Sequence, residues 1–282
     1  MPSLPQLNSA SIFYRPDNSK ARAWAGKFAP LLKKQGIKIY DQPMARQFLF
    51  VLGGDGAILE AVRRYHQINP IIVGMNLGGV GFLASVRKQK NFIRAIQQII
   101  AGKYWIVEKM MLQATILRKG RKIATIEALN EILIQNPLGM VHISIYVADH
   151  LMQEIRGTGA LIATPTGSTA FNLSAHGPLV MPDLNAIIMS EILDHNIPTP
   201  SIVLDTRHEI TLCVEDFRKR ELLSLTATHE KFDIILSADG ETLVPLQKND
   251  MIIIRKHKQP ARFVELERNY FLKSLQEKFT FR

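Results

Sequence analysis

The stretch Phe48-Leu49-Phe50-Val51-Leu52-Gly53-Gly54-Asp55-Gly56 decides the fold of the region around it. Five consecutive apolar residues predict a buried strand, and the three glycines predict a turn where the backbone approaches a neighbour or a ligand closely. The carboxylate of Asp55 therefore follows the carboxyl end of a strand. Ligands bind at that edge of open α/β sheets, so Asp55 is a candidate catalytic residue. An ordinary β-turn that tolerates aspartate is the competing interpretation.

Strands and helices alternate on both sides of this stretch. Strands are predicted at residues 11–14, 37–40, 47–52 and 71–75, and helices at residues 19–35, 56–66 and 91–101. Such alternation is typical of a parallel sheet with flanking helices. Residues 1–108 are therefore expected to form an α/β domain that contains the Gly-Gly-Asp-Gly turn.

The pattern changes after about Met110, where apolar segments of strand length follow one another with turn residues between them. These segments cover residues 112–117, 122–129, 132–134, 142–148, 159–163, 202–204, 209–214, 233–237 and 251–255. They predict a mostly antiparallel, β-sandwich-like second domain over residues 109–255. Residues 256–282 are expected to form a C-terminal segment, helical from Tyr270, that packs back on the first domain.

The composition is that of a globular protein, with 282 residues of which 46% are hydrophobic and 21% charged. Lys and Arg (35) exceed Asp and Glu (25), and the net charge of +10 favours phosphorylated partners. The cations form no stripe, so no nucleic acid partner is expected. No apolar window is long enough for a membrane span, so no membrane partner is expected. With one cysteine and no leader-like start, a cytoplasmic protein is expected.

Three further stretches depart from what packing alone requires. They are Gly78-Gly79-Val80-Gly81, Asn130-Glu131, and Arg156-Gly157-Thr158-Gly159 with the closely following run from Thr164 to Ser174. In that last run, several hydroxyls precede a helix predicted to begin near Ser168 or Thr169, which would supply donors for an anion. A plain ST-turn and N-cap is the alternative. The eight histidines show no metal-ligand spacing, so the chain is expected to supply no metal ligands.

Five motifs, taken in order, resemble the bacterial NAD kinases, which use ATP to phosphorylate the 2′-hydroxyl of the adenosine ribose of NAD. The motifs are Gly53-Gly54-Asp55-Gly56, Asn76-x-Gly78-x-x-Gly81-Phe82-Leu83, Asn130-Glu131, Thr164-Pro165-Thr166-Gly167-Ser168-Thr169-Ala170 and Ser237-Ala238-Asp239-Gly240. The first motif is shared with diacylglycerol-type lipid kinases and phosphofructokinases, whereas the fourth is much more particular. The resemblance spans roughly residues 48 to 245.

The resemblance implies specific roles for residues of these motifs. Asp55 would be the general base for the ribose hydroxyl, and Gly53, Gly54 and Gly56 would approach nucleotide phosphates. Asn130 and Glu131 would hold ribose hydroxyls or an end of NAD. The other residues implied in the dinucleotide site are His142, Arg156, Thr158, Thr169, Ala170, Phe171, Asn172, Leu173 and Ser174. The resemblance also implies Mg²⁺ or another divalent cation that arrives with ATP, and a homodimer or homotetramer.

Several positions depart from the family pattern. The departures are Ala57 for Thr, Thr158 for Asp, Phe171 for Tyr, His176 for Gly, Pro200 for Arg and Glu241 for Gln. They leave open a catalytically weak NAD(P)-binding regulatory protein, and the first motif leaves open a lipid or other small-molecule kinase. The choice between NAD and NADH, and between ATP and polyphosphate, also stays open.

Overall fold

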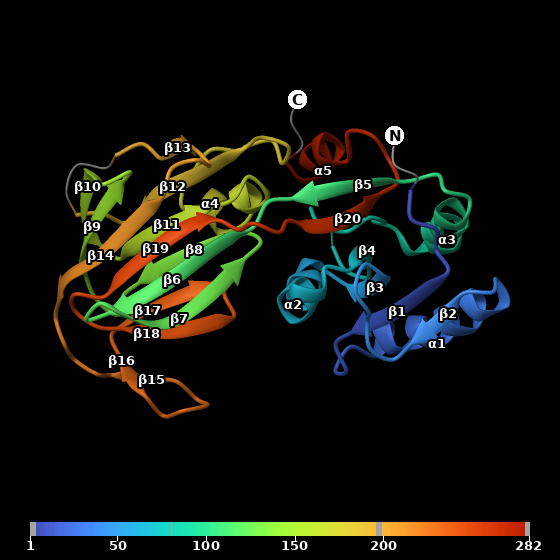
Figure 1. The fold of residues 1–282 in the computed structure, drawn as a ribbon, viewed down its shortest axis with the longest axis horizontal. Coiled ribbons are helices and arrows are strands. Elements are labelled where there is room, and N and C mark those ends of the chain that lie inside the picture. The colour runs from blue at the N-terminus through green and yellow to red at the C-terminus, as the bar shows by residue number, and fades with distance from the viewer. Residues whose placement is uncertain (1–3, 80, 196–198, 280–282) are drawn as a thin grey trace. The chain divides into compact units, whose positions relative to one another are not determined.

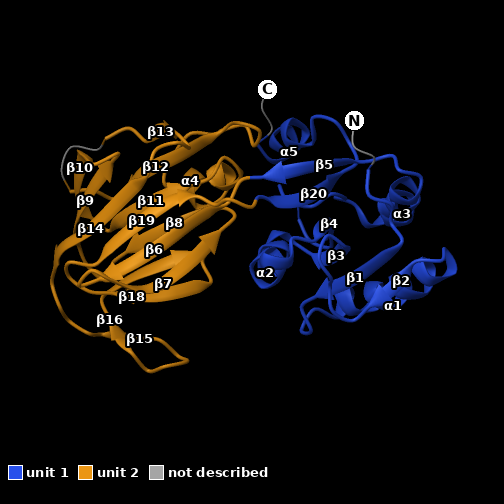
Figure 2. Cartoon of the chain, viewed as in Figure 1, with its two compact units in different colours: residues 1–109, 260–282 blue, residues 110–259 orange. Residues whose placement is uncertain are grey.

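The computed structural model describes residues 4–79, 81–195 and 199–279, and the chain divides into two compact units (Figure 2). Unit 1 comprises residues 1–109 and 260–282, and unit 2 comprises residues 110–259. The chain therefore leaves unit 1 once, builds the whole of unit 2, and returns to complete unit 1.

Unit 1 is built on a six-stranded sheet in the order β2-β1-β3-β4-β20-β5 (Figure 1). Neighbouring strands are parallel except β20 and β5, which are antiparallel. The strands are β1 (Ser9–Tyr14), β2 (Lys38–Tyr40), β3 (Phe48–Gly53), β4 (Ile71–Asn76), β5 (Trp105–Lys109) and β20 (Ala261–Glu265). The predicted α/β class is confirmed. The strand β20, far along the chain, is an element that the sequence pattern does not reveal.

Helices flank this sheet, as the alternating pattern predicts. They are α1 (Ser19–Lys34), α2 (Asp55–Tyr65), α3 (Phe92–Ile100) and α5 (Tyr270–Phe279), with short 3₁₀ turns η1 (His66–Ile68) and η2 (Gln89–Asn91). Helices α1 and α3 share one apolar cluster with β1, β3 and β4. In that cluster the ring of Phe92 lies 5.0 Å from Trp24 and 5.7 Å from Phe28, measured between centroids. The two helices therefore cover the same face of the sheet.

Unit 2 consists mainly of two six-stranded antiparallel sheets, which confirms the predicted β-sandwich class. One sheet has the order β10-β9-β14-β19-β6-β7 and the other β13-β12-β11-β8-β17-β18. The first contains β6 (Leu112–Arg118), β7 (Arg121–Ala128), β9 (Val141–Val147), β10 (His150–Gly157), β14 (Ile210–Phe217) and β19 (Met251–Lys256). The second contains β8 (Glu131–Gln135), β11 (Gly159–Ala163), β12 (Ala186–Ile192), β13 (Ile202–Asp205), β17 (Ile234–Ala238) and β18 (Thr242–Leu246).

Shorter elements complete unit 2. A two-stranded ribbon is formed by β15 (Leu223–Ser224) and β16 (Lys231–Phe232). A 3₁₀ turn, η3 (Thr166–Thr169), and a four-residue helix, α4 (Phe171–Ser174), follow β11. These two short elements carry the residues between Thr164 and Ser174 that the sequence marks as unusual.

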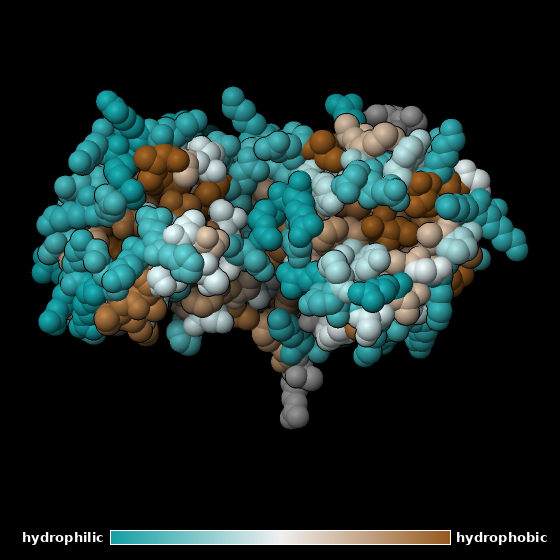
Figure 3. All heavy atoms as spheres, turned by 90° about the horizontal axis from the view of Figure 1, so that it is seen from below, coloured by the Kyte–Doolittle hydropathy of each residue, from teal (hydrophilic) through white to brown (hydrophobic). Residues whose placement is uncertain are grey.

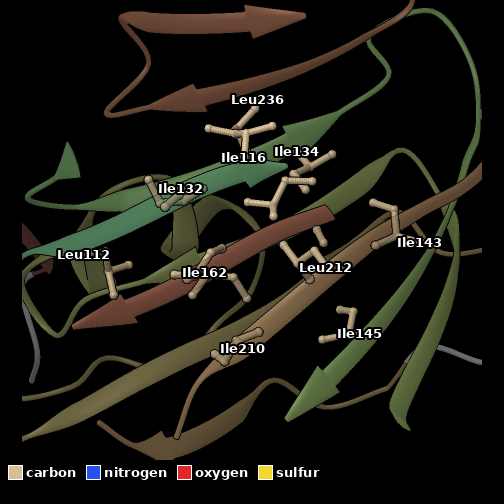
Figure 4. Close-up of a cluster of buried hydrophobic side chains, with 14 of the residues drawn as sticks. Leu112, Ile116, Ile132, Ile134, Ile143, Ile145, Ile162, Ile210, Leu212 and Leu236 are labelled. Atoms are coloured by element: carbon tan, nitrogen blue, oxygen red, sulfur yellow. The ribbon is translucent and has the colours of Figure 1, made fainter. Parts of the chain in front are cut away.

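The core of unit 2 lies between its two large sheets. Inward-facing aliphatic residues of both sheets form one cluster, including Ile116, Ile143 and Leu212 from one sheet and Ile134 and Ile162 from the other, all fully buried. Figure 4 shows these side chains pointing toward one another from opposite strands. Burial alternates along β6 and β14, where the period-2 pattern in the sequence specifies the inner face, whereas β11 and β17 are buried along their whole length.

On the face shown in Figure 3, apolar atoms form separate groups among hydrophilic side chains. Within the described ranges, none of the helices combines the length and apolar character that a membrane span requires.

The sandwich core predicts a clear contrast between two leucines of unit 2. Leu212→Ala leaves a cavity at a fully buried site and should lower the free energy of unfolding by about 2–5 kcal/mol. Leu222→Ala, at a side chain that is 66% exposed, should change it by no more than about 0.5 kcal/mol. Urea unfolding followed by far-ultraviolet circular dichroism measures both. Equal effects of the two substitutions would contradict the packing described.

Candidate active site

Asp55 is held in a defined orientation at the end of β3. It is the first residue of α2, and Gly54 is the N-cap of that helix. The backbone N–H of Phe82 donates to Asp55 Oδ2 at 2.8 Å, and the N–H of Leu83 donates to Oδ1 at 3.3 Å. Both carboxylate oxygens thus accept from one short segment, and the helix N-terminus adds a favourable field for a negative charge.

The carboxylate also explains two glycines of the motifs. A Cβ built at Gly81 would lie 2.6 Å from Asp55 Cγ and 2.8 Å from Oδ2, so a side chain there would displace the carboxylate. A Cβ built at Gly53 would lie 2.6 Å from the Cβ of Ala57. Both positions require close approach, and the neighbour at Gly81 is the candidate catalytic group itself.

The asparagine of the second motif shapes the turn that leads to Gly81. Buried Asn76 accepts from the N–H of Gly78 at 3.0 Å through Oδ1 and donates to the Gly79 carbonyl at 2.6 Å through Nδ2. Val86 then pairs with β4: its N–H donates to the Gly74 carbonyl at 2.9 Å. The Asn-x-Gly spacing is therefore an Asx-type turn that aims the following amides at Asp55.

A buried lysine, Lys109 at the end of β5, lies in the electrostatic surroundings of Asp55. Its side chain is almost completely buried. Burial lowers the pKa of Lys109, and the negative charges of Glu265 and Asp55 oppose that change. The sequence gives no signal for this residue, because a lone lysine after a strand is ordinarily a solvated one.

In unit 2, Asp239 organises the turn between β7 and β8. Its carboxylate accepts from the backbone N–H groups of Leu129 at 2.9 Å, Asn130 at 2.8 Å and Glu131 at 3.1 Å. Asp239 and Gly240 both have left-handed backbone, with φ of 51° and 71°. The Asp-Gly pair is the sequence signal for this turn, although it does not reveal which amides the carboxylate binds.

Glu131 lies beside Asp239 but differs from it in its hydrogen bonds. Its Oε2 is buried and has no hydrogen-bond partner among the described residues, while the N–H of Phe171 donates to its carboxyl group. Burial, followed by the charge of Asp239, raises the pKa of Glu131 to about 8, and the Phe171 N–H partly opposes this. At neutral pH Glu131 is therefore largely protonated and can both donate and accept a hydrogen bond.

The hydroxyls of the Thr164–Ser174 run bind the protein's own backbone. Thr164 Oγ1 donates to the Leu129 carbonyl at 2.6 Å, and Ser168 Oγ donates to the Val180 carbonyl at 3.1 Å. The helix expected from Ser168 or Thr169 is wrong, because Ala170 has non-helical φ and ψ of −98° and −130° and separates η3 from α4. The hydroxyls of Thr164, Ser168 and Thr169 therefore fix the loop beside Asn130, and these three residues are buried.

Residues Thr169 to Ser174 divide into structural and accessible positions. Asn172 is fully buried, donates to the Pro178 carbonyl at 3.1 Å and accepts from Ser190 Oγ at 3.0 Å. Thr169 is buried and donates to the Thr166 carbonyl at 3.3 Å. Ala170 and Leu173 are partly exposed, and Phe171 and Ser174 are exposed. The Phe171 ring is thus available to a ligand next to Glu131.

Two site candidates lie at the other end of β11 from this group. His142 on β9 and Arg156 on β10 are direct cross-strand partners. They line a pocket of about 600 Å³ together with Arg218, Arg220 and Asp233. Thr158 lies between β10 and β11, and its N–H donates to the Ile192 carbonyl at 2.9 Å. The structure brings Asn130, Glu131 and Phe171 together, and it brings His142 and Arg156 together elsewhere in unit 2.

Comparisons with known proteins agree with the motifs. The N-terminal domain model of the ATP-NAD kinases matches residues 41–104, and the C-terminal domain model matches residues 129–266. The NAD kinase of Lachnoclostridium phytofermentans is 33% identical over 233 residues, which cover 81% of this chain and 78% of that protein. The chain belongs to the NAD kinase family. A second relative, the NAD kinase of Symbiobacterium thermophilum, is 32% identical over 234 residues, or 82% and 78% of the two chains.

Solved structures of NAD and NADH kinases share the fold of this family member. Yeast NADH kinase complexed with NADH superposes with a TM-score of 0.84 at 19% identity, covering 98% of this chain and 88% of that one. The NAD kinase of Archaeoglobus fulgidus in complex with ATP gives 0.72 at 22% identity, covering 96% and 97%. At these identities the likeness concerns the fold.

Gly81→Ala should show whether position 81 requires glycine because there is no space for a side chain. The new methyl group would overlap the Asp55 carboxylate, so we expect the free energy of unfolding to fall by about 1–3 kcal/mol. Gly79→Ala is the matched control, since a Cβ there meets nothing within 4 Å. Thermal and urea unfolding of both variants provide the measurement. A stability loss equal in the two variants would argue against the contact.

The raised pKa of Glu131 predicts a pH dependence of stability. Folded Glu131 keeps its proton up to about pH 8, whereas the reference value is 4.5, so the folded state binds more protons between these values. The stability that Glu131 contributes is therefore full at low pH and is lost as pH rises toward 8. Glu131→Gln should give a flatter profile, with a difference of at most about 1.4 kcal/mol per pH unit. Urea unfolding at pH 5.5, 6.5 and 7.5 measures this, and parallel profiles would contradict it.

Proposed function

We propose that this protein transfers the terminal phosphoryl group of ATP to the 2′-hydroxyl of the adenosine ribose of NAD, giving NADP. The family assignment supports the reaction class. The single structural observation that carries the assignment of the catalytic residue is the carboxylate of Asp55, held by the amides of Phe82 and Leu83 at the carboxyl end of β3. A carboxylate fixed at the end of a strand can orient the hydroxyl group that accepts the phosphoryl group.

Asp55 would act on the hydroxyl that receives the phosphoryl group. Phosphoryl transfer depends mainly on positioning and on neutralising charge, and aspartate is a weak base toward an alcohol. We therefore assign to Asp55 the orientation of the 2′-hydroxyl and acceptance of its proton late in the transfer. The two amide donors fix the direction of the carboxylate, which leaves its remaining lone pairs for the substrate.

Glu131 and Asn130 are the residues we assign to the NAD ribose. The unpartnered buried Oε2 of Glu131 is a polar atom for which a ligand hydroxyl would supply the missing hydrogen bond. A protonated Glu131 can donate to one ribose oxygen and accept from another. The exposed ring of Phe171 beside it offers a flat apolar surface for a base or a nicotinamide ring.

ATP is the second substrate, and we propose that it brings the divalent metal ion to the site. We assign Gly53, Gly54 and Gly56 to the approach of nucleotide phosphates, since Gly56 is exposed at the start of α2. Among the described residues, neither unit by itself gathers three His, Cys, Asp or Glu ligand atoms close enough for a metal ion. We propose that ATP binds as its magnesium complex, because phosphoryl transfer requires a cation that neutralises the charge of the phosphates.

A second group of residues lies away from Glu131 and comprises His142, Arg156 and Thr158. Arg156 and its neighbours in the 600 Å³ pocket supply cations suited to a dinucleotide phosphate. Because these residues lie at the far end of β11 from Glu131, we propose that they serve NAD in a homo-oligomer, a dimer or tetramer. Thr158 stands where the family pattern has Asp, so a carboxylate is missing from this part of the site. For this reason we propose both NADH and NAD as candidate substrates.

The decisive experiment is NADP formation by purified protein with ATP, Mg²⁺ and NAD, compared with Asp55→Asn. We expect the wild type to form NADP and the variant to lose activity by about two or more orders of magnitude, while the NAD dissociation constant changes by no more than about threefold. The reason is that an amide cannot accept the proton, yet fills the same space. Parallel assays with NADH and with polyphosphate define the substrate range.

Each alternative gives a distinct result in this experiment. Tight NAD binding without any NADP would select the regulatory binding protein. No NAD binding, together with phosphorylation of a lipid, would select the lipid kinase. An Asp55→Asn variant with wild-type turnover would remove Asp55 from the catalytic role while leaving the reaction itself established.

A further inference from the structure

The C-terminal helix α5 contacts the segment that binds Asp55, and both belong to unit 1. The ring of Phe82 lies 5.8 Å from that of Phe271 and 6.4 Å from that of Phe279, measured between centroids. The Lys278 ammonium lies 4.8 Å from the centroid of the Phe82 ring. Positions 271, 278 and 279 share one face of a helix, so one face of α5 packs against the Phe82 ring.

Arg87 makes a second contact between the segment and α5. Its guanidinium donates to the Tyr270 carbonyl at 3.1 Å and pairs with the Glu277 carboxylate at 3.0 Å. It also lies 4.4 Å from the centroid of the Tyr270 ring. The Arg87 side chain is only 11% exposed and that of Glu277 is 43% exposed, so the guanidinium end of this pair is shielded from water.

The helix is itself firmly seated in unit 1. Tyr270 and Ser274 are buried, and Ser274 Oγ donates to the Tyr270 carbonyl at 2.9 Å. Burial raises the pKa of Tyr270 to about 12, so its phenol is neutral at any physiological pH. The buried residues Tyr270 and Ser274 therefore fix α5 to unit 1 next to the face that contacts Phe82.

The sheet packs against the middle of the segment, since a Cβ built at Gly74 of β4 would lie 2.8 Å from Ala84 Cα, and it forms hydrogen bonds with the far end. Ser85 Oγ accepts from the N–H of Gly74 at 3.1 Å, and the N–H of Val86 donates to the Gly74 carbonyl at 2.9 Å. These hydrogen bonds with β4 begin three residues after Phe82. The near end, which carries both amides that bind Asp55, is packed against α5 through the Phe82 ring. The position of those amides therefore depends on α5 as well as on β4.

We propose that α5 positions Asp55 for the transfer, acting through Phe82, with Phe271, Phe279 and Glu277 as positioning residues. The inference rests on the proposed function of Asp55. N–H···O hydrogen bonds usually span about 2.7–3.2 Å, and the Leu83 bond is already at 3.3 Å, so a shift of Phe82 by a fraction of an ångström loosens the carboxylate. Misplacement of a reacting group by about 1 Å is enough to slow an enzyme about a hundredfold.

A double-mutant cycle tests this coupling. Phe271→Ala should lower kcat by about tenfold and leave both KM values within about twofold, because it disturbs the orientation of Asp55 and not substrate binding. In the Asp55→Asn background the same substitution should change kcat by no more than about twofold, since the oriented carboxylate is already lost. Phe271→Leu should restore most of the rate. Leu272→Ala, at a neighbouring side chain that is 45% exposed, is the matched control.

Amide hydrogen exchange provides a readout that needs no activity. In Phe271→Ala the N–H groups of Phe82 and Leu83 should exchange at least about tenfold faster than in the wild type, and Leu272→Ala should leave them unchanged. Glu277→Gln removes the pair with Arg87 at a side chain that is 43% exposed. It should produce the same effects in weaker form, which keeps the test available if Phe271→Ala does not fold.

Two results would overturn the inference. One is an equal loss of kcat from Phe271→Ala in both backgrounds, which would indicate a general structural role. The other is unchanged exchange at Phe82 and Leu83 in Phe271→Ala, or in Glu277→Gln where that is the variant that folds. A wild type that makes no NADP is a different failure: it would refute the proposed function, whereas the exchange measurement would still decide whether α5 holds the segment.

Discussion

Two hydrogen bonds, from the amides of Phe82 and Leu83 to Asp55, are the constraint around which unit 1 is arranged. They require that β3 end at Gly53, so that Asp55 begins α2 at the strand end. They also require the turn built by Asn76, which leads the chain back over the strand end. Position 81 must be glycine, because the carboxylate occupies the place of a side chain. Each motif of the first domain is thus a part of one hydrogen-bonded arrangement.

Unit 2 places two acidic side chains together and distinguishes them by the donors that each receives. Asp239 accepts from three backbone amides, whereas Glu131 has one amide and a buried oxygen with no partner among the described residues. Two negative charges close together in a poorly solvated site repel each other. Because Glu131 is buried and lies beside the charge of Asp239, its pKa is raised and it keeps its proton. A carboxyl group that is neutral near pH 7 can donate a hydrogen bond to a ligand, which an ordinary glutamate cannot do.

The sequence predicts the regular parts of this structure because hydrophobic period and glycine placement are local signals. The strand at Phe48–Gly53, the helix after Asp55 and sandwich strands such as β6 and β14 follow from such patterns, whereas β10, β12 and β18 are not among the predicted strands. Lys109, β20 and the contacts of α5 are not predictable in that way, because they depend on which distant segments meet. The run from Thr164 to Ser174 is intermediate: its importance is evident from the sequence, but its hydroxyls bind carbonyls that only the fold brings near.

The glycines of the motifs have a more specific meaning than flexibility. At Gly81 and Gly167 of the motifs, and at Gly177 outside them, the space of a side chain is filled by a polar group of the protein: the Asp55 carboxylate, the Asn130 carbonyl and the Asn172 amide. None of the three has a left-handed φ. Glycine is needed at these positions because a polar group must lie directly against the backbone. A Gly-rich motif can therefore position a reacting or structural group, and a phosphate need not be its ligand.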